Sequence, residues 1–290
     1  MTAGARLQDI VRRLGGDLYD GGRRALVPGP GHGSEDRSVS LLVSGDRIVL
    51  HSFAGDDWRE VARHLRLGRA GGDAPEPGAA APALSQPERL ACAAALWDTA
   101  RPVAGTPGAW HARRRGIHRA LPEALRFHAG VSSAVYADAG RRRPALLAAI
   151  RDPAGRLCGV EVAYLDRSGG PAAMRLPRKI IGLAAGGAVR LDPPGETLLV
   201  GEGVFSSLSA GARFGQPAWA LLSVGNLRRW SPPAGVRRVI IAGDRGRPGE
   251  AGAAALQTRL RELAVAAVVR LPPDPWEDWN AWAGDGRTPA

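Results

Sequence analysis

Two acidic residues beside glycines offer the clearest chemistry in this sequence. Glu202 follows the aliphatic run 198–200 with one glycine between, and Asp244 follows the run 239–242 in the same way. Each run has the composition of a buried parallel strand, and a helical pattern comes after each acid. Open α/β sheets bind ligands at the carboxyl ends of such strands. Two acids in this setting indicate metal-assisted chemistry on phosphate groups.

Each acid also has a purely structural interpretation. Glu202 can serve as a general base or hold Mg²⁺ through water, but an ordinary strand-end turn gives the same Gly-Glu-Gly pattern. Asp244 can direct a carboxylate at a phosphate-bound metal, or it can cap the following helix. The two motifs together are more specific than either alone.

Asp278 is a third candidate, in the segment Asp278-Trp279-Asn280 beyond the last predicted strand. It can add a carboxylate that supports the metal ligands. The alternative is a polar C-terminal loop in which Trp276, Trp279 and Trp282 cover the core instead of stacking against bases.

No zinc site is expected. The two cysteines, Cys92 and Cys158, cannot form a four-ligand site alone. His32 and His51 lack two further ligands of suitable type, so surface or hydrogen-bonded histidines are expected. The sequence has no Gly-x-Ser-x-Gly elbow and no phosphate-binding loop of the ATPase type, which argues against those two classes of hydrolase.

The charge of the chain favours a polyanionic partner. The formal net charge is +11, and every basic residue except Lys179 is an arginine, the side chain that binds phosphate in bidentate fashion. A GC-rich genome also produces such a composition, and arginine runs are usually solvated faces. The basic residues that can line a groove for a nucleic-acid backbone are Arg113, Arg114, Arg115, Arg175, Arg178 and Lys179.

No apolar run approaches the length of a membrane span, and no basic-then-apolar segment opens the chain. Two cysteines without a disulfide pattern favour a reducing compartment. The sequence therefore predicts a soluble, cytoplasmic protein with no membrane partner.

Composition and periodicity divide the chain into four segments. Residues 1–67 combine helices with a strand hairpin, which indicates a small α+β module. Residues 68–85 are rich in Gly, Ala and Pro, as in a linker. Residues 86–195 form a predicted α+β domain with an irregular stretch at 121–135. Residues 196–290 alternate strands and helices, which predicts a parallel sheet flanked by helices. Its strands are expected near 197–201, 218–222, 236–242 and 265–270.

These motifs resemble those of the Toprim proteins, and among them the primase-like proteins of phages, plasmids and mobile genetic elements. Segment 198–203 resembles the motif that carries the Toprim glutamate, and 240–249 resembles the following Asp-x-Asp motif. Segment 278–280 resembles the terminal Asp-Trp-Asn of that group. Stretches between 97 and 128 resemble the domain commonly found before such a Toprim unit, and residues 1–67 resemble a primase zinc ribbon.

The resemblance implies a Toprim-type parallel sheet at the C-terminus, preceded by an α+β primase-like region and a module derived from a zinc ribbon. It implies RNA primer synthesis on single-stranded DNA, with Mg²⁺ (or Mn²⁺), ribonucleoside triphosphates and a replicative helicase as partners. Glu202 would assist proton transfer at the attacking hydroxyl, and Asp244 would hold metal at the triphosphate.

The metal motif departs from the family pattern. It reads Asp244-Arg245-Gly246, so the second carboxylate is missing and Arg245 adds positive charge, which weakens Mg²⁺ binding and adds a nucleic-acid contact. Glu250 or Asp278 can substitute for the lost ligand. A non-catalytic Toprim protein that binds nucleic acid is therefore the second hypothesis, and a Toprim nuclease or topoisomerase-related factor is a weaker third.

The zinc-ribbon resemblance has a departure too. Ser52 and Asp56 stand where thiolates are expected, and only His32 remains as a former ligand. A carboxylate and one imidazole do not rebuild a structural zinc site, so this module is expected to hold by its core alone.

Overall fold

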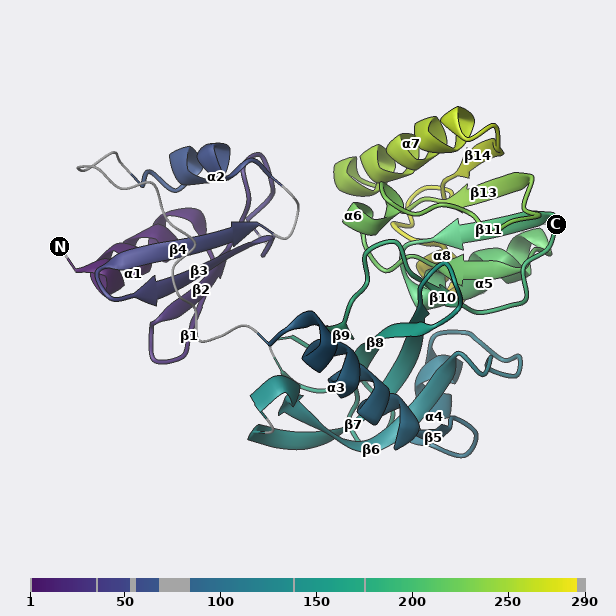
Figure 1. The fold of residues 1–290 in the computed structure, drawn as a ribbon, viewed down its shortest axis with the longest axis horizontal. Helices are drawn as coiled ribbons and strands as arrows, with labels where there is room; N and C mark the ends of the chain where they lie inside the picture. Colours follow the sequence, from purple (N-terminus) through teal and green to yellow (C-terminus); the bar gives the residue numbers. More distant parts are fainter. Residues whose placement is uncertain are drawn as a thin grey trace. The chain divides into compact units, whose positions relative to one another are not determined.

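The computed structural model describes residues 2–34, 36–52, 56–67, 84–137, 139–174 and 176–285. The chain divides into two compact units, Met1–Ala83 and Leu84–Ala290 (Figure 1). The predicted linker lies outside the described residues except for its last two positions, and Arg175 lies outside them as well. No helix in the described ranges is long and apolar enough to cross a membrane.

The N-terminal unit packs two helices on a small antiparallel sheet. Its elements are α1 (Ala3–Leu14), β1 (Asp17–Tyr19), β2 (Arg24–Val27), β3 (Val39–Ser44), β4 (Arg47–Ser52) and α2 (Trp58–His64), with strand order β1-β2-β3-β4. The predicted hairpin is confirmed, because Ser44 pairs with Arg47. Leu7 and Ile10 of α1 are buried against β2 and β3, and Asp57 caps α2.

The first half of the C-terminal unit is mainly antiparallel sheet. Its elements are α3 (Gln86–Asp98), β5 (Arg101–Pro102), α4 (Pro107–Arg114), β6 (Leu125–Ala134), the 3₁₀ turn η1 (Val135–Ala137), β7 (Ala139–Arg151), β8 (Leu157–Tyr164), β9 (Arg178–Gly182) and β10 (Ala188–Arg190). The expectation of irregular structure at 121–135 is wrong, because β6 pairs with β7 along most of its length. A register shift separates His128 from Val131, and Val131 and Ser132 are buried consecutively, so buried and exposed residues do not alternate regularly.

The second half alternates strands and helices, as predicted. Its elements are β11 (Thr197–Gly201), α5 (Val204–Phe214), β12 (Ala218–Ala220), α6 (Val224–Leu227), β13 (Arg238–Ala242), α7 (Arg247–Glu262), β14 (Ala266–Arg270) and α8 (Trp279–Gly284). Strands β14, β13, β11 and β12 are parallel neighbours in that order. The predicted parallel sheet flanked by helices is therefore confirmed.

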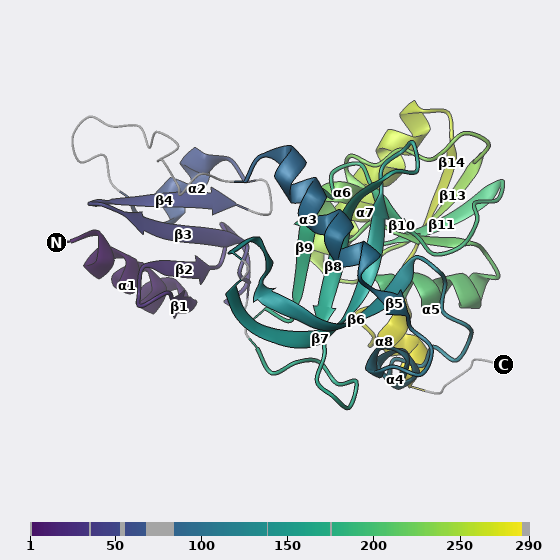
Figure 2. The same cartoon turned by 60° about the horizontal axis from the view of Figure 1, so that its bottom comes forward.

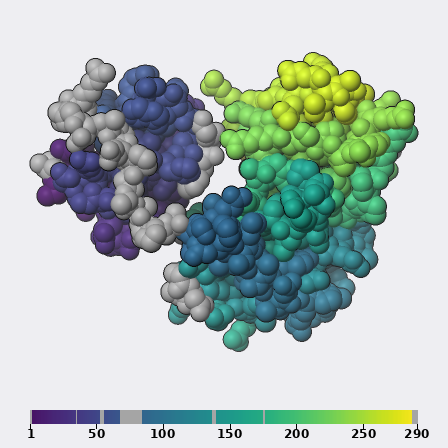
Figure 3. Space-filling view, viewed as in Figure 1, coloured from purple at the N-terminus to yellow at the C-terminus, as the bar shows by residue number. Residues whose placement is uncertain are grey.

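One continuous sheet joins the two halves. The short strand β10 pairs antiparallel with β12 on one side and with β7 on the other. Figure 2 shows the curved strands β6 and β7 leading through β10 to β11, and Figure 3 shows the teal residues of the first half in direct contact with the green residues of the second. The proposed boundary at 195/196 thus lies within a single compact unit.

Helix α8 fastens the C-terminal segment to this unit. The Asn280 side chain donates to the backbone oxygen of Arg115 at 2.6 Å and to Ser209 Oγ at 3.0 Å. Trp279 and Trp282 are 4% and 8% exposed, so they pack in the core and do not present faces for stacking with bases. The packing alternative for these tryptophans is the one observed.

Candidate active site

Glu202 and Asp244 follow the ends of two neighbouring strands, β11 and β13. Gly201 and Ala242, the last residues of β11 and β13, are register partners in a parallel pair. Both acids therefore follow neighbouring strand ends at the same edge of the sheet. Glycine is needed at position 201, because a Cβ there would lie 2.7 Å from Ser207 Oγ of the following helix.

Ser206 connects this edge to the C-terminal helix. It is buried on the first turn of α5, and its hydroxyl donates to Asp244 Oδ1 at 3.4 Å while accepting from the backbone N–H of Trp279 at 3.2 Å. The sequence analysis did not single out Ser206. The signal available was its position four residues after Glu202, which places it on the first turn of the helix that follows this acid.

The two carboxyl groups repel each other. Burial, and then the charge of Asp244, raise the pKa of Glu202 to about 7, against the backbone hydrogen bond from Val224. Burial, and then the charge of Asp278, raise the pKa of Asp244 to about 6, although the Ser206 hydroxyl lowers it. Three carboxylates thus form an electrostatically coupled row, and a cation beside it would relieve the repulsion.

The donor set suits a hard cation. Carboxylate and hydroxyl oxygens are ligands for Mg²⁺, which is commonly held by one or two carboxylates together with water and phosphate. Asp278 has a structural role as well, because its Oδ1 accepts from the N–H groups of Asn280 and Ala281, both at 2.7 Å, and so caps α8. Across the described ranges no three His, Cys, Asp or Glu side chains form a metal-binding group. Glu202 and Asp244, at neighbouring strand ends, are the carboxylates that a cation at this edge would meet.

The raised pKa values predict how stability depends on pH. Unfolded glutamate ionises near 4.5 and folded Glu202 near 7, so the stability from binding this proton is present below about pH 4.5 and lost as the pH rises through about 7. Without metal, Glu202→Gln should therefore raise the free energy of unfolding by about 3 kcal/mol at pH 8 and change it little at pH 4. Denaturant unfolding at the two pH values measures this; equal effects at both would contradict the assignment.

Glu250 and Arg245 have their observed contacts away from the two acids. Glu250 is exposed on the first turn of α7 and accepts from the backbone N–H of Gly246 at 3.2 Å, near its own helix N-terminus. Arg245 holds the loop before α8: its Nε donates to the Pro272 oxygen at 2.7 Å, and its guanidinium pairs with Asp274 at 3.2 Å. The structure brings neither into a contact with Glu202 or Asp244.

Two of the predicted basic residues do come close to the acids. The guanidinium of Arg115 is half-buried over the Phe205 ring, with 5.5 Å to the centroid. Burial and then the charge of Arg178 lower the pKa of Arg115, and the charge of Asp278 acts in the opposite direction. Arg115 thus interacts electrostatically with Arg178 and with Asp278, the acid that caps α8.

The other basic candidates are more dispersed. Arg113 and Arg114 are exposed on the last turn of α4. Lys179 donates to the Ser133 backbone oxygen at 2.5 Å and lies over the Tyr164 ring. Arg178 and Lys179 are consecutive residues of β9, so their side chains point to opposite faces of the sheet.

A buried carboxyl group on β8 also escaped the sequence analysis. Glu161 lines a small cavity together with Arg178 and Phe205. Burial raises the pKa of Glu161, and the charge of Arg178 opposes this effect. Glu161 lies inside an aliphatic strand, so the sequence pattern did not indicate that this acid lines a cavity beside Phe205.

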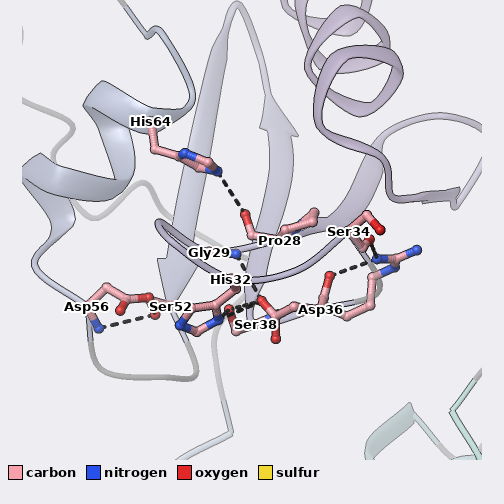
Figure 4. Close-up of polar contacts among 10 residues, drawn as sticks. Pro28, Gly29, His32, Ser34, Asp36, Ser38, Ser52, Asp56 and His64 are labelled. Atoms are coloured by element: carbon pink, nitrogen blue, oxygen red, sulfur yellow. Dashed lines mark hydrogen bonds and ion pairs between the residues drawn. The ribbon is translucent and has the colours of Figure 1, made fainter. Parts of the chain in front are cut away.

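In the N-terminal unit, hydrogen bonds occupy the place where the resemblance expects a metal. Asp36 Oδ2 accepts from the Gly29 N–H at 2.9 Å and from the Ser38 hydroxyl at 2.5 Å, and it lies 2.9 Å from His32 Nδ1 (Figure 4). Ser52 Oγ donates to Asp56 Oδ2 at 2.7 Å. Oxygen atoms and one imidazole make a poor zinc site, and this cluster is already satisfied internally. Besides its hydrophobic core, this unit therefore contains a cluster of polar hydrogen bonds around Asp36.

Comparison with known proteins adds two family matches. Residues 87–191 match a domain of unknown function, DUF7146, and residues 197–286 match the Toprim domain. No curated protein matches the chain.

Among solved structures, the Aquifex aeolicus primase (zinc-binding and RNA polymerase domains) is 13% identical, with a TM-score of 0.46 over 97% of this chain and 80% of that one. The primase fragment of the bacteriophage T7 primase-helicase is 12% identical, with a TM-score of 0.40 over 89% and 93%. The RNA polymerase domain of Mycobacterium tuberculosis primase DnaG is 17% identical, with a TM-score of 0.42 over 69% and 82%.

The family match and the geometry agree on the C-terminal segment. It begins at the strand that carries Glu202, contains the strand that carries Asp244, and ends on the helix capped by Asp278. Residues 197–286 of this chain are a Toprim domain.

Proposed function

We propose that this protein is a primase-type nucleotidyltransferase, which joins ribonucleotides on a single-stranded DNA template with Mg²⁺ or Mn²⁺. The observation that carries the proposal is the pair of coupled carboxylates, Glu202 and Asp244, at neighbouring strand ends of a Toprim domain. The motif resemblance upstream and at 278–280 favours a primase over other Toprim enzymes. It also favours a role in phage, plasmid or mobile-element replication beside a replicative helicase.

The chemistry assigns a task to each group. The attacking 3′-hydroxyl forms a bond to the α-phosphorus of the incoming nucleotide, the bond to the β-phosphate oxygen breaks, and pyrophosphate leaves. Glu202, with a pKa of about 7, is suited to accept the proton of that hydroxyl near neutral pH. An ion held by Glu202 and Asp244 would supply positive charge for the triphosphate. Arg115 and Arg178 would bind phosphate oxygens beside it.

The experiment is primer synthesis with labelled ribonucleotides on single-stranded DNA, with Mg²⁺ or Mn²⁺, comparing the wild type with Glu202→Gln. Product from the wild type and a loss of about 10²-fold or more in the variant are expected if Glu202 accepts the proton. Product unaffected by the substitution would remove Glu202 from the mechanism.

A non-catalytic nucleic-acid-binding protein is the alternative, and one observation favours it. The family's second metal carboxylate is replaced by Gly246, and within the described part of the chain no third His, Cys, Asp or Glu completes a metal-binding group. No product from either protein, together with DNA binding by both, would support this alternative.

A further inference from the structure

A groove runs behind the acid row, along the junction of α4, α5 and α8. One cavity of about 290 Å³ lies among the turn after α4, the second half of α5 and Trp282 of α8. A second cavity, of about 600 Å³, lies between the loop after β5 and residues 117–126. Residues Ile117, His118 and Arg119 line both cavities. The two cavities therefore adjoin at these residues, and we call the surface that they form together the 117–119 groove.

Unpaired arginines stand at both ends of the 117–119 groove. Arg113 lines the larger cavity, is exposed, and forms no ion pair with any residue that the structure describes. Arg213 lines the smaller cavity, where its guanidinium lies over the rings of Phe214 and Trp282, with 6.0 and 5.7 Å to the centroids. These arginines keep their hydrogen-bond donors available for an anion.

Other cations of the 117–119 groove have structural partners. Arg119 pairs with Asp192 at 2.9 Å. Arg126 donates to the Trp97 backbone oxygen at 3.1 Å and lies 4.5 Å from the centroid of its ring. Glu123, which lines the larger cavity, is the one acid among the described residues that line the two cavities, so the surface keeps a net positive charge. Apolar residues between the charges, such as Ile117 and Leu121, provide surface for the faces of bases.

The groove also lies close to the acids. Asp278, which is coupled to Asp244, begins α8, and Trp282 of the groove lies four residues later on the same helix. At 1.5 Å per residue, this separation along the helix axis is about 6 Å. Helix α8 therefore links the smaller cavity to the acid that is coupled to Asp244.

We propose that the 117–119 groove binds the phosphate backbone of single-stranded nucleic acid, with Arg113 and Arg213 as its two principal contacts. The proposal takes nucleic acid as the ligand from the proposed function, but it does not require catalysis. A cationic groove with apolar floor is the kind of surface that binds single strands without sequence preference.

The test is fluorescence anisotropy of a labelled oligothymidylate, titrated with wild type and with Arg113→Ser/Arg213→Ser over a series of salt concentrations. At low salt the affinity of the double variant should be at least about tenfold lower than that of the wild type. Its plot of log affinity against log salt concentration should be less steep, by about 2 in slope, because two phosphate contacts are lost. Arg113→Lys/Arg213→Lys, which keeps both charges, should recover most of the affinity if both variants fold.

The matched control is Arg229→Ser/Arg261→Ser, which removes two exposed arginines that line neither cavity. Its affinity should stay close to that of the wild type. Equal losses in the control and groove variants, or no loss in the groove variant, would overturn the proposal. A further competition uses polyglutamate, to see whether it displaces the probe as efficiently as unlabelled DNA does. Equal displacement would assign the groove to an acidic protein partner and would also overturn the proposal.

Failure of this proposal is separable from failure of the proposed function. Primer synthesis tests Glu202 and Asp244, whereas the anisotropy test is done without metal or nucleotides.

Discussion

Asp244→Asn is expected to lower the rate of ribonucleotide incorporation by about 10³-fold, or about 4 kcal/mol in the activation free energy. The substitution keeps the size of the side chain and an oxygen that can accept from Ser206. It removes the charge that would bind a cation between the ends of β11 and β13. Because it also removes repulsion with Glu202 and Asp278, the folded state should be at least as stable as the wild type.

This combination separates a loss of chemistry from a loss of structure. Initial rates on single-stranded DNA and thermal unfolding of the same preparations measure the two effects. Glu262→Gln, the same loss of one charge at an exposed position of α7, is the matched control and should synthesise primers at the wild-type rate. An Asp244→Asn variant that is as active as the control would refute the role of Asp244.

Asp36→Ala is expected to destabilise the N-terminal unit by about 2–4 kcal/mol, since several donors lose one charged acceptor at once. Gly29, Ser38 and His32 all direct polar atoms to the Asp36 carboxylate. Burial raises the pKa of Asp36, but the hydrogen bonds from Ser38, Gly29 and His32 outweigh it and lower the pKa from 3.8 to about 2. The carboxylate's contribution is thus present above about pH 4 and is lost as the pH falls through about 2.

Hydrogen exchange of the backbone amides of β3, followed in the full chain, reports on this unit alone. Asp36→Ala should accelerate their exchange at pH 7, and Asp46→Ala should not, because the Asp46 side chain is 97% exposed in the β3–β4 turn. Chelators should not change exchange in the wild type. Acceleration by a chelator, or equal exchange in the two variants, would contradict a role for the Asp36 cluster in place of a metal.

The placement of Glu202 and Asp244 could be predicted because it depends on local rules. Aliphatic runs of strand length followed by helical patterns fix a parallel sheet, and parallel strands end at one edge. The sequence also singled out Asp278 as a candidate. Its role as the N-cap of α8 was not predicted, because the loop-like composition of 272–285 gave no indication of a short helix.

Long-range contacts account for what the sequence did not reveal. Ser206 acquires its role only when α8 returns to α5 across more than seventy residues, and Glu161 meets Arg178 only through the pairing of β8 with β9. The Asp36 cluster depends on hydrogen bonds from the backbone as well as from side chains, and backbone donors leave no trace in composition. Strand β6 was missed because its register shifts interrupt the alternation of buried residues.

The most direct measurement of the central claim is calorimetric titration of the protein with Mn²⁺ at pH 6 and pH 8. If Glu202 and Asp244 hold the ion, binding should be tighter at pH 8 and should release protons near pH 6, because their pKa values lie at about 7 and about 6. Glu202→Gln/Asp244→Asn should abolish it. Binding of Mn²⁺ that is independent of pH and unchanged in the double variant would contradict a metal-dependent site at the ends of β11 and β13.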